Sequence, residues 1–292
     1  MAAFNKEAEQ TRSLLRQLGV RPQRLRGQNF LIDPAAIQRI AAVGFDWPGK
    51  DVVEIGPGLG ALSRCLAEKA GGLTLIELEP AFAAYLRQEF SASPQVQVVE
   101  RDALQYDFTA SPAEYVLFAN VPYQITTPLL KKLFLSGGVW RSMVLLLQKE
   151  AAERICCERG RKNGPLSLLA AYCGICESCF DLLPASFYPS PAVTSTVIRI
   201  QRREAPPVDT DIAAILRLAE AAFAERRKLL CNSLAASSLP GDHKYWRAGL
   251  TACGLDTECR AESLSLAEFA ALCAWQQKNM PPTAGSGGIT AE

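Results

Sequence analysis

The feature that most constrains this chain is a glycine cluster that directly follows a short apolar run. Residues 51–55 read Asp-Val-Val-Glu-Ile, which predicts a buried strand, and residues 56–60 read Gly-Pro-Gly-Leu-Gly. Residues 61–69 then have the spacing of a helix. In such a strand–turn–helix the glycines let the backbone approach a ligand closely, and the helix start offers free N–H groups. The order therefore predicts a ligand site at the carboxyl end of a parallel sheet.

Apolar runs and helical stretches alternate along the first two-thirds of the chain. Further strands are expected at residues 73–78, 96–99, 115–119 and 143–147, and helices at 10–19, from Asp33 onward and at 81–90. This alternation is typical of βαβ units and predicts a mostly parallel sheet. The predicted fold class is therefore α/β, with a Rossmann-like domain over residues 1–204.

A second domain is expected after residue 204. Residues 202–207 are polar and broken by prolines, which predicts a boundary. Beyond it, apolar residues fall on one face of a helix: Ile212, Ile215, Leu216, Ala219, Ala222 and Phe223. Residues 265–268 read as a capping box that opens a last helix. We therefore expect a small all-helical domain over residues 205–279, followed by a disordered tail at 280–292.

The composition is that of an ordinary globular protein. The 292 residues are 49% apolar and carry a formal net charge of +1, so a nucleic-acid site must be a local patch. Ten cysteines would fit an oxidising compartment, but the first residues lack the pattern of an export signal. We expect reduced thiols and a cytoplasmic protein, with an organelle transit peptide as the alternative. No uncharged run is both long enough and free of proline to cross a bilayer, so no membrane partner is expected.

Two acidic residues follow successive predicted strands. Glu77 lies 21 residues after Gly56, where its carboxylate can accept hydrogen bonds from both hydroxyls of a ribose. Asp102 follows the next strand and can accept from an adenine amino group. Taken singly, each could be a solvated strand-end acid. Together with Glu54 and a Gly-x-Gly-x-Gly loop, which differs from pyrophosphate-binding loops, they favour S-adenosylmethionine over NAD.

Residues 120–123 read Asn-Val-Pro-Tyr and follow the fourth predicted strand. An aromatic amino nitrogen is a poor nucleophile because its lone pair is delocalised into the ring. The side-chain oxygen of Asn120 and the backbone carbonyl of Val121 can accept its N–H bonds and so favour the tetrahedral nitrogen that attacks a methyl group. Pro122 stiffens the loop, and Tyr123 offers a face for adenine to stack on. The alternative is an ordinary turn, which this position in the sheet disfavours.

Six separated blocks resemble the bacterial small-subunit rRNA adenine dimethyltransferases of the KsgA type, in the same order along almost the whole chain. The blocks are GQNFL at 27–31, VEIGPG at 53–58, NVPY at 120–123, LLQKE at 146–150, FYPSPAV at 187–193, and FAERRK at 223–228 with Asn232. One residue departs from the family pattern, because Val121 stands where leucine is commoner. Its expected role is through the backbone, so this substitution should preserve the role while altering the width of the pocket.

The resemblance implies a site and a substrate. The implied cofactor contacts to S-adenosylmethionine are Asn29, Leu31, Gly56, Gly58, Glu77, Asp102 and Asn120. It also implies that Phe187 stacks on the target base opposite Tyr123, and that residues 1–50 hold helices and an arm that binds RNA and cofactor. The implied substrate is a pair of adjacent adenosines near the 3′ end of 16S rRNA in the small ribosomal subunit, each methylated twice on N6 during ribosome biogenesis.

Basic residues in two runs are candidates for contacts with RNA phosphates. They are Arg24 and Arg26 in the N-terminal arm, and Arg226, Arg227 and Lys228 in the second domain. A charge run is usually a solvated face of a helix. Two runs that flank the expected target site favour RNA as the partner.

Three closely spaced cysteines, Cys173, Cys176 and Cys179, invite the hypothesis of a zinc or iron–sulfur site. A fourth ligand at the expected spacing is missing, and a strand at residues 170–180 would turn Cys173 and Cys176 to opposite faces. We therefore interpret the cysteines as small apolar residues and expect no metal. His243 is the single histidine, which excludes histidine-based catalysis at the predicted site.

Three functions stay open at this point. The first is the dimethylation of 16S rRNA by a monomeric enzyme. The second is methylation of adenine in 23S rRNA, as in the related macrolide-resistance family, or in DNA. The third is a ribosome-assembly factor for which methylation is secondary. The presence of the full set Asn120, Tyr123, Glu77 and Asp102 favours catalysis.

Overall fold

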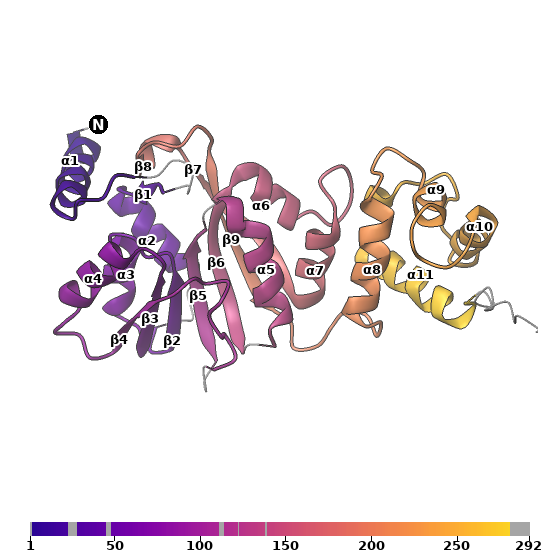
Figure 1. The fold of residues 1–292 in the computed structure, drawn as a ribbon, viewed down its shortest axis with the longest axis horizontal. Coiled ribbons are helices and arrows are strands. Elements are labelled where there is room, and N and C mark those ends of the chain that lie inside the picture. The colour runs from indigo at the N-terminus through magenta and orange to yellow at the C-terminus, as the bar shows by residue number, and fades with distance from the viewer. Residues whose placement is uncertain are drawn as a thin grey trace, which may run out of the picture. The chain divides into compact units, whose positions relative to one another are not determined.

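The chain forms two compact units in the computed structural model (Figure 1), which describes residues 2–22, 28–44, 48–110, 114–121, 123–137 and 139–280. The sheet unit comprises Met1–Cys156 and Cys173–Arg203. The helical unit comprises Cys157–Tyr172 and Glu204–Glu292. The sequence analysis had placed residues 157–172 in the first domain, whereas the structure packs them with the C-terminal helices.

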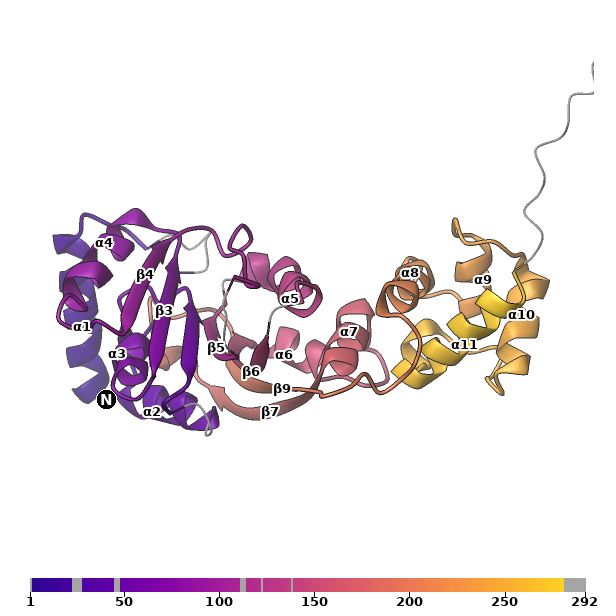
Figure 2. The same ribbon diagram turned by 90° about the horizontal axis from the view of Figure 1, so that it is seen from below.

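A seven-stranded sheet forms the centre of the sheet unit, in the order β4-β3-β2-β5-β6-β9-β7 (Figure 2). Its strands are β2 Asp51–Ile55, β3 Gly72–Glu77, β4 Val96–Glu100, β5 Tyr115–Asn120, β6 Trp140–Gln148, β7 Gly174–Leu182 and β9 Ser195–Arg202. The pairs among β2 to β6 are parallel, and β9 runs antiparallel to both β6 and β7. The predicted α/β class with a mostly parallel sheet is confirmed, although β9 was missed.

The register of the three central strands aligns their carboxyl ends. Ile55 of β2 pairs with Ile76 of β3 on one side and with Ala119 of β5 on the other. The residue that follows each of these three, at positions 56, 77 and 120, therefore emerges at the same edge of the sheet.

Helices cover the sheet and bury apolar residues on it. The helices of this unit are α1 Ala2–Gln17, α2 Pro34–Val43, α3 Ala61–Ala67, α4 Pro80–Glu89, α5 Thr126–Leu135 and α6 Lys149–Ile155. Ile40 of α2 and Leu66 of α3 share one apolar cluster with Val116 and Phe118 of β5. These side chains are at most 3% exposed, so this packing contributes about 1.5–3 kcal/mol for each large residue.

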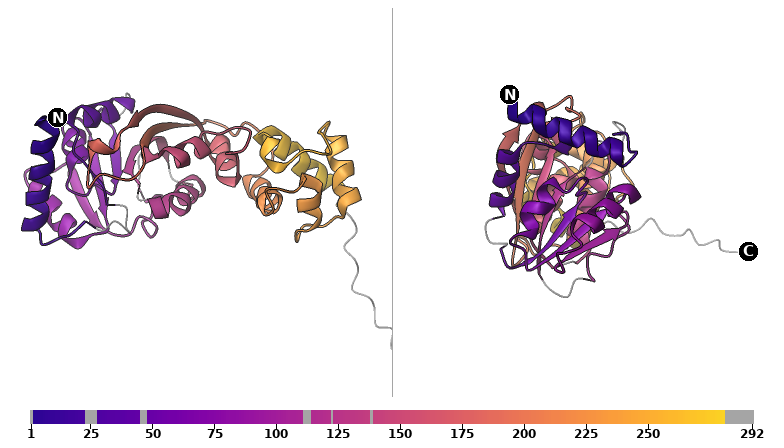
Figure 3. Two further views of the ribbon diagram at one scale, coloured as in Figure 1. Left: turned by 90° about the horizontal axis from the view of Figure 1, so that it is seen from above. Right: turned by 90° about the vertical axis from the view of Figure 1, so that its left-hand side faces the viewer.

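A short second sheet joins two segments that are far apart in the sequence. In it β1 Phe30–Leu31 pairs antiparallel with β8 Phe187–Tyr188. Asp33 strengthens the junction, because one carboxylate oxygen caps α2 by accepting from Ala36 N at 3.1 Å and the other accepts from Ser186 Oγ at 3.0 Å. Helix α1, drawn in indigo in Figure 3, contacts β8.

The helical unit has its own core. Its helices are α8 Ile212–Phe223, α9 Leu230–Ala235, α10 His243–Ala252 and α11 Leu266–Lys278, joined by most of α7 Pro165–Cys173. Trp246, Phe269 and Leu168 meet in one buried cluster. The predicted capping box is confirmed, since the Ser265 side chain caps α11 and Glu268 accepts in return from the Ser265 backbone.

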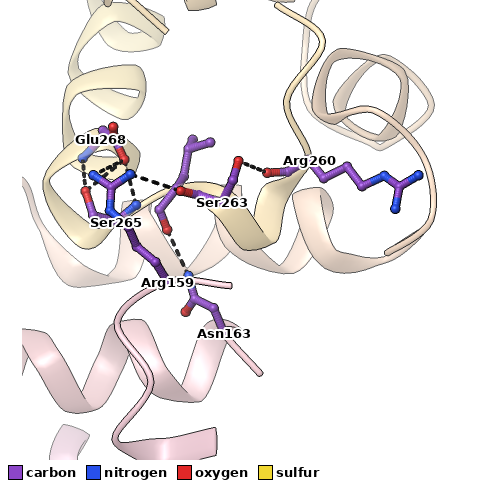
Figure 4. Close-up of polar contacts among 7 residues, drawn as sticks. Arg159, Asn163, Arg260, Ser263, Ser265 and Glu268 are labelled. Carbon is purple, nitrogen blue, oxygen red and sulfur yellow. Dashed lines mark hydrogen bonds and ion pairs between the residues drawn. The ribbon is translucent and has the colours of Figure 1, made fainter. Parts of the chain in front are cut away.

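The loop before α7 is tied to the C-terminal helices by polar contacts (Figure 4). Arg159 donates to Ser263 O at 3.1 Å and pairs with Glu268 at 3.0 Å. Asn163 is fully buried, and its Nδ2 donates to Leu264 O at 2.8 Å while its Oδ1 accepts from Gly164 N at 2.8 Å. These contacts explain why residues 157–172 belong to the helical unit.

Two elements differ from their predicted bounds. The segment 170–180 was expected to be a strand, but its first part belongs to helix α7, which ends at Cys173, and strand β7 begins at Gly174. The helix extends this far because the apolar run from Leu166 to Ala170 packs as a buried helix. Helix α1 begins at Ala2 rather than near residue 10. Of the tail expected at 280–292, residues 281–292 lie outside the described residues.

We expect Asn163→Ala to lower the free energy of unfolding by about 2–4 kcal/mol, because Leu264 C=O and Gly164 N–H would lose their buried partner. Urea unfolding followed by circular dichroism measures the change. Arg260→Ala is the control, since the Arg260 side chain points away from these contacts (Figure 4) and should change stability by less than about 0.5 kcal/mol. A loss below about 1 kcal/mol for Asn163→Ala would contradict the anchoring role.

Candidate active site

A cavity of about 530 Å³ opens at the carboxyl edge of the sheet. Its lining contains all seven residues for which the sequence implied a cofactor contact: Asn29, Leu31, Gly56, Gly58, Glu77, Asp102 and Asn120. Strand register explains why Gly56, Glu77 and Asn120 meet there. Asn29 and Leu31 belong to the chain around β1, and the spacing of residues in the sequence could not predict that this segment lies at the cavity.

The glycine loop after β2 has a backbone that other residues adopt poorly. Gly56, Gly58 and Gly60 have φ angles of +71°, +56° and +74°. A Cβ at Gly58 would also lie 3.2 Å from the ring of Phe30. The loop is therefore shaped by glycine, and it approaches both β1 and the start of α3 closely.

Glu77 is held by the same loop. Its Oε2 accepts from Gly58 N at 2.9 Å and its Oε1 accepts from Glu79 N at 2.9 Å. The side chain is 7% exposed, and burial raises its pKa, while these backbone N–H groups oppose the rise. Each carboxylate oxygen keeps further acceptor capacity toward the cavity, as the ribose interpretation requires.

Glu54 lies deeper, at the end of β2. It is 3% exposed, and its Oε2 has no hydrogen-bond partner among the described residues. Burial raises the pKa of Glu54 to about 7, and the Glu77 carboxylate adds to the rise. A buried carboxylate oxygen that has no partner in a residue lining a cavity is suited to a polar or cationic ligand group.

Asp102 takes part in a turn, with its Oδ1 accepting from Leu104 N at 2.8 Å. Two apolar neighbours of the strand-end acids, Leu78 and Ala103, also line the cavity. Leu78 is 57% exposed, which is unusual for leucine and provides an apolar surface beside Glu77. The sequence analysis missed both, although an apolar residue directly after each acid was a usable signal.

The charges of the described cavity lining distinguish between cofactors. They comprise six carboxylates, Glu7, Glu54, Glu77, Glu79, Glu89 and Asp102, and two guanidinium groups, Arg64 and Arg101. Arg64 is paired with Glu89 at 3.2 Å. An acidic cavity attracts the sulfonium and ammonium groups of S-adenosylmethionine and repels the pyrophosphate of NAD. The residues present therefore fit S-adenosylmethionine.

Asn120 ends β5 and lines this cavity. Its Nδ2 donates to the backbone oxygen of Asn29 at 3.1 Å, and no described residue donates to its Oδ1. Because one side of the amide is held, the Oδ1 has a defined direction as an acceptor. Val121 follows with its side chain 1% exposed and its N–H donating to Leu146 O at 3.2 Å. The backbone at both positions is thus fixed from the sheet.

The expected stacking residues are placed differently. Phe187 is 3% exposed and packs in a core cluster with Leu31 and Leu182, so its ring face is covered in this structure. A base could stack on Phe187 only after this packing opens, and the stacking role stays a prediction. Tyr123 begins a short 3₁₀ turn at Tyr123–Ile125. Pro122 and the Tyr123 side chain lie outside the described structure.

The basic residues proposed to contact phosphates differ in how far their side chains are already engaged. Arg226 donates to Arg161 O at 2.8 Å and to Asn163 O at 2.9 Å, so its guanidinium stabilises the helical unit. Lys228 pairs with Glu225, whereas Arg227 is exposed. Arg24 and Arg26 lie outside the described residues. Arg227 is therefore the best placed of the described candidates for RNA, and the contact itself stays a prediction.

The three spaced cysteines do not converge. Cys173 Sγ contacts Phe134 O at 3.8 Å from the end of α7, and Cys179 Sγ contacts Glu177 O at 3.8 Å within β7. Cys176 instead lies next to Cys156, and their contact lowers the pKa of Cys156. Within the described ranges, no group of three or more potential ligands could hold a metal ion.

No helix of the described part of the chain has the length and hydropathy to cross a membrane.

Two solved structures share the fold. A dimethyladenosine transferase from Plasmodium falciparum superposes with a TM-score of 0.74 at 22% identity, covering 85% of this chain and 98% of that one. The 23S rRNA methyltransferase ErmE gives a TM-score of 0.68 at 24% identity, covering 85% of this chain and 100% of that one. At these identities the two structures establish the Rossmann-like fold alone.

Sequence relatives carry the comparison further. Proteins named ribosomal RNA small subunit methyltransferase A are 39% identical in Magnetococcus marinus, over 89% of this chain and 93% of the relative, and 38% identical in Desulfitobacterium hafniense, over 94% and 98%. Residues 22–278 match the family described as ribosomal RNA adenine dimethylase. The chain belongs to the ribosomal RNA adenine dimethylase family, whose members use S-adenosylmethionine.

Proposed function

We propose that this protein dimethylates the N6 amino groups of two adjacent adenosines near the 3′ end of 16S rRNA, in the small ribosomal subunit or its precursor. The observation that carries the proposal is Asn120, which lines the acidic cavity and whose Oδ1 has no described donor. Relatives at 36–39% identity are named small-subunit methyltransferases, which supports this substrate. We further infer a monomer that acts in ribosome biogenesis in the cytoplasm.

The proposed chemistry needs acceptors rather than a strong base. When bound, S-adenosylmethionine supplies an electrophilic methyl group. The Oδ1 of Asn120 and the carbonyl oxygen of Val121 accept the N–H bonds of the adenine amino group and draw its lone pair out of conjugation. The Asn120 amide is held through its Nδ2, which donates to Asn29 O, and the Val121 backbone is held through its N–H, which donates to Leu146 O. Dipoles that are oriented in advance oppose the developing positive charge with little reorganisation.

The remaining residues position the reactants. Glu77 accepts from the ribose hydroxyls of the cofactor, and Asp102 accepts from its adenine amino group. Leu78 offers an apolar surface beside them. This arrangement supplies orientation for an in-line displacement, which can account for several orders of magnitude in rate.

The alternatives are less well supported. The small-subunit relatives are 36–39% identical, whereas the 23S enzyme ErmE is 24% identical and resembles this chain in fold. A pure assembly factor would not require a constrained amide at the edge of a cofactor cavity. A role in subunit assembly alongside methylation is compatible with the same site.

Transfer of tritiated methyl groups from S-adenosylmethionine tests the proposal directly. Undermethylated small subunits, naked 23S rRNA and DNA serve as parallel substrates. Label is expected in small subunits, at adjacent adenosines carrying two methyl groups each. Label confined to 23S rRNA or DNA would overturn the assignment.

Asn120→Ala should lower the rate of methyl transfer by about 10²–10⁴-fold, because one of the two oriented acceptors is lost. Binding of S-adenosylmethionine, measured by calorimetry, should weaken much less. Gln97→Ala removes an exposed amide on β4 of the same unit and should leave the rate within two-fold, as a roughly neutral surface change. Normal turnover by Asn120→Ala would remove Asn120 from the catalytic role.

Glu54 predicts a pH dependence of stability in the ligand-free protein. Because burial raises its pKa from 4.5 to about 7, the folded state holds a proton that the unfolded state releases between these values. The protonated Glu54 contributes its full share to the free energy of unfolding below pH 4.5, and this contribution is lost as the pH rises through 7. The free energy of unfolding falls by about 3 kcal/mol at most.

Glu54→Gln should abolish this loss. Urea unfolding of the wild type and of Glu54→Gln at pH 5 and pH 8 gives the change in the free energy of unfolding with pH for each protein. The difference between these two changes isolates the contribution of Glu54 from that of other titrating groups. The same pH change in Glu54→Gln as in the wild type would show that Glu54 is ionised in the fold without penalty.

A further inference from the structure

Helix α1 is a part of the sheet unit that the family match does not assign. The helix spans Ala2–Gln17, whereas the match to the ribosomal RNA adenine dimethylase family begins at residue 22. Nothing in the six sequence blocks involves it either. Its position in the structure is nevertheless defined by specific contacts.

One face of α1 lines the cavity that holds Glu77, Asp102 and Asn120. The four residues of this face, Glu7, Gln10, Thr11 and Leu14, follow the spacing of successive turns of one helix side. Three of them are polar. A face that only packed against the protein core would be expected to be apolar.

The neighbouring face of α1 anchors the helix. Leu15 is 3% exposed and packs in a cluster with Phe30, Leu59 and Phe82, two of which come from β1 and the glycine loop. Leu14, Leu18 and Val20 are packed against the same cluster. The helix is therefore seated directly on the elements that shape the cofactor loop.

A second anchor ties α1 to β8. Arg12 Nε donates to the hydroxyl of Tyr188 at 3.2 Å, and the guanidinium lies 5.4 Å from the centre of the Tyr188 ring. Glu9 pairs with the same guanidinium at 2.9 Å. With an apolar and a polar anchor on adjacent faces, the orientation of the cavity-facing side is determined.

We propose that α1 forms one wall of the S-adenosylmethionine site, in which Glu7, Gln10 and Thr11 are cofactor-binding residues. A carboxylate, an amide and a hydroxyl suit a ligand that carries an ammonium group, a sulfonium and ribose hydroxyls. Glu7 adds to the acidic lining and stabilises the cationic cofactor more than its neutral thioether product. This inference deepens the proposed function and rests on it.

Occlusion of the cavity from α1 is the first test. Thr11→Trp places a bulky ring on the cavity-facing side, whereas Ser13→Trp places the same ring on the exposed far side of the same helix. Calorimetric titration of the full-length variants with S-adenosylmethionine measures Kd, and thermal unfolding checks the fold. We expect Kd to rise at least about ten-fold for Thr11→Trp and to stay within two-fold for Ser13→Trp.

Charge removal is the second test and needs no added volume. Glu7→Gln should weaken the binding of S-adenosylmethionine by roughly two- to three-fold relative to S-adenosylhomocysteine, because only the former carries the sulfonium charge. Glu68→Gln removes an equal charge from an exposed residue of the sheet unit that does not line the cavity, and it should leave this ratio unchanged. A role of Glu7 in folding alone would alter both affinities equally.

The outcomes separate this inference from the proposed function. If the wild type binds S-adenosylmethionine and Thr11→Trp binds it equally well, α1 is not a wall of the site and only the inference fails. If the wild type does not bind S-adenosylmethionine at all, the proposed function fails first. If Thr11→Trp does not fold, the affinity ratio of Glu7→Gln decides, and an unchanged ratio overturns the inference.

Discussion

Backbone hydrogen bonds hold β2 in parallel register between β3 and β5, and the chemistry of this protein depends on that alignment. Parallel strands send their carboxyl ends to one edge, so Gly56, Glu77 and Asn120 follow paired residues of adjacent strands. If one strand were shifted by a single residue, its side chains would turn to the opposite face of the sheet, and these three residues would no longer meet. The glycine loop, Glu77 and Asn120 therefore come together through one ladder of paired strands.

A second, much smaller ladder completes the site. Pairing of β1 with β8 brings the chain around Asn29 to the sheet edge, where Asn29 O accepts from the Asn120 amide nitrogen and fixes the orientation of the amide. In the same pairing Leu31 of the cavity lining lies opposite the buried Phe187, so β8, which carries the predicted stacking residue, adjoins the cavity. A displacement of β8 would displace the paired β1, and with it the Phe30 ring that lies beside Gly58 in the glycine loop.

Electrostatics select the ligand within this frame. Carboxylates outnumber guanidinium groups in the described lining, and one of the guanidinium groups is already paired. The balance suits a cationic donor and disfavours phosphates, which agrees with the spacing of the glycine loop. Arg226, a predicted phosphate contact, donates to two carbonyl oxygens of its own unit, because a guanidinium can satisfy several acceptors at once.

The sequence by itself determined the features that depend on local pattern: the α/β class, the strand-end acids, the glycine loop, the caps of α2 and α11, and through its blocks the family. Tertiary structure alone decided which distant segments meet. Residues far apart in the chain meet in contacts such as those of Asn120 with Asn29, Phe187 with Leu31, and Asn163 with Leu264. The polar face of α1 likewise meets the cavity only in the folded structure. Local propensity carries no information about such pairings, because packing and the satisfaction of buried polar groups choose them over the whole fold.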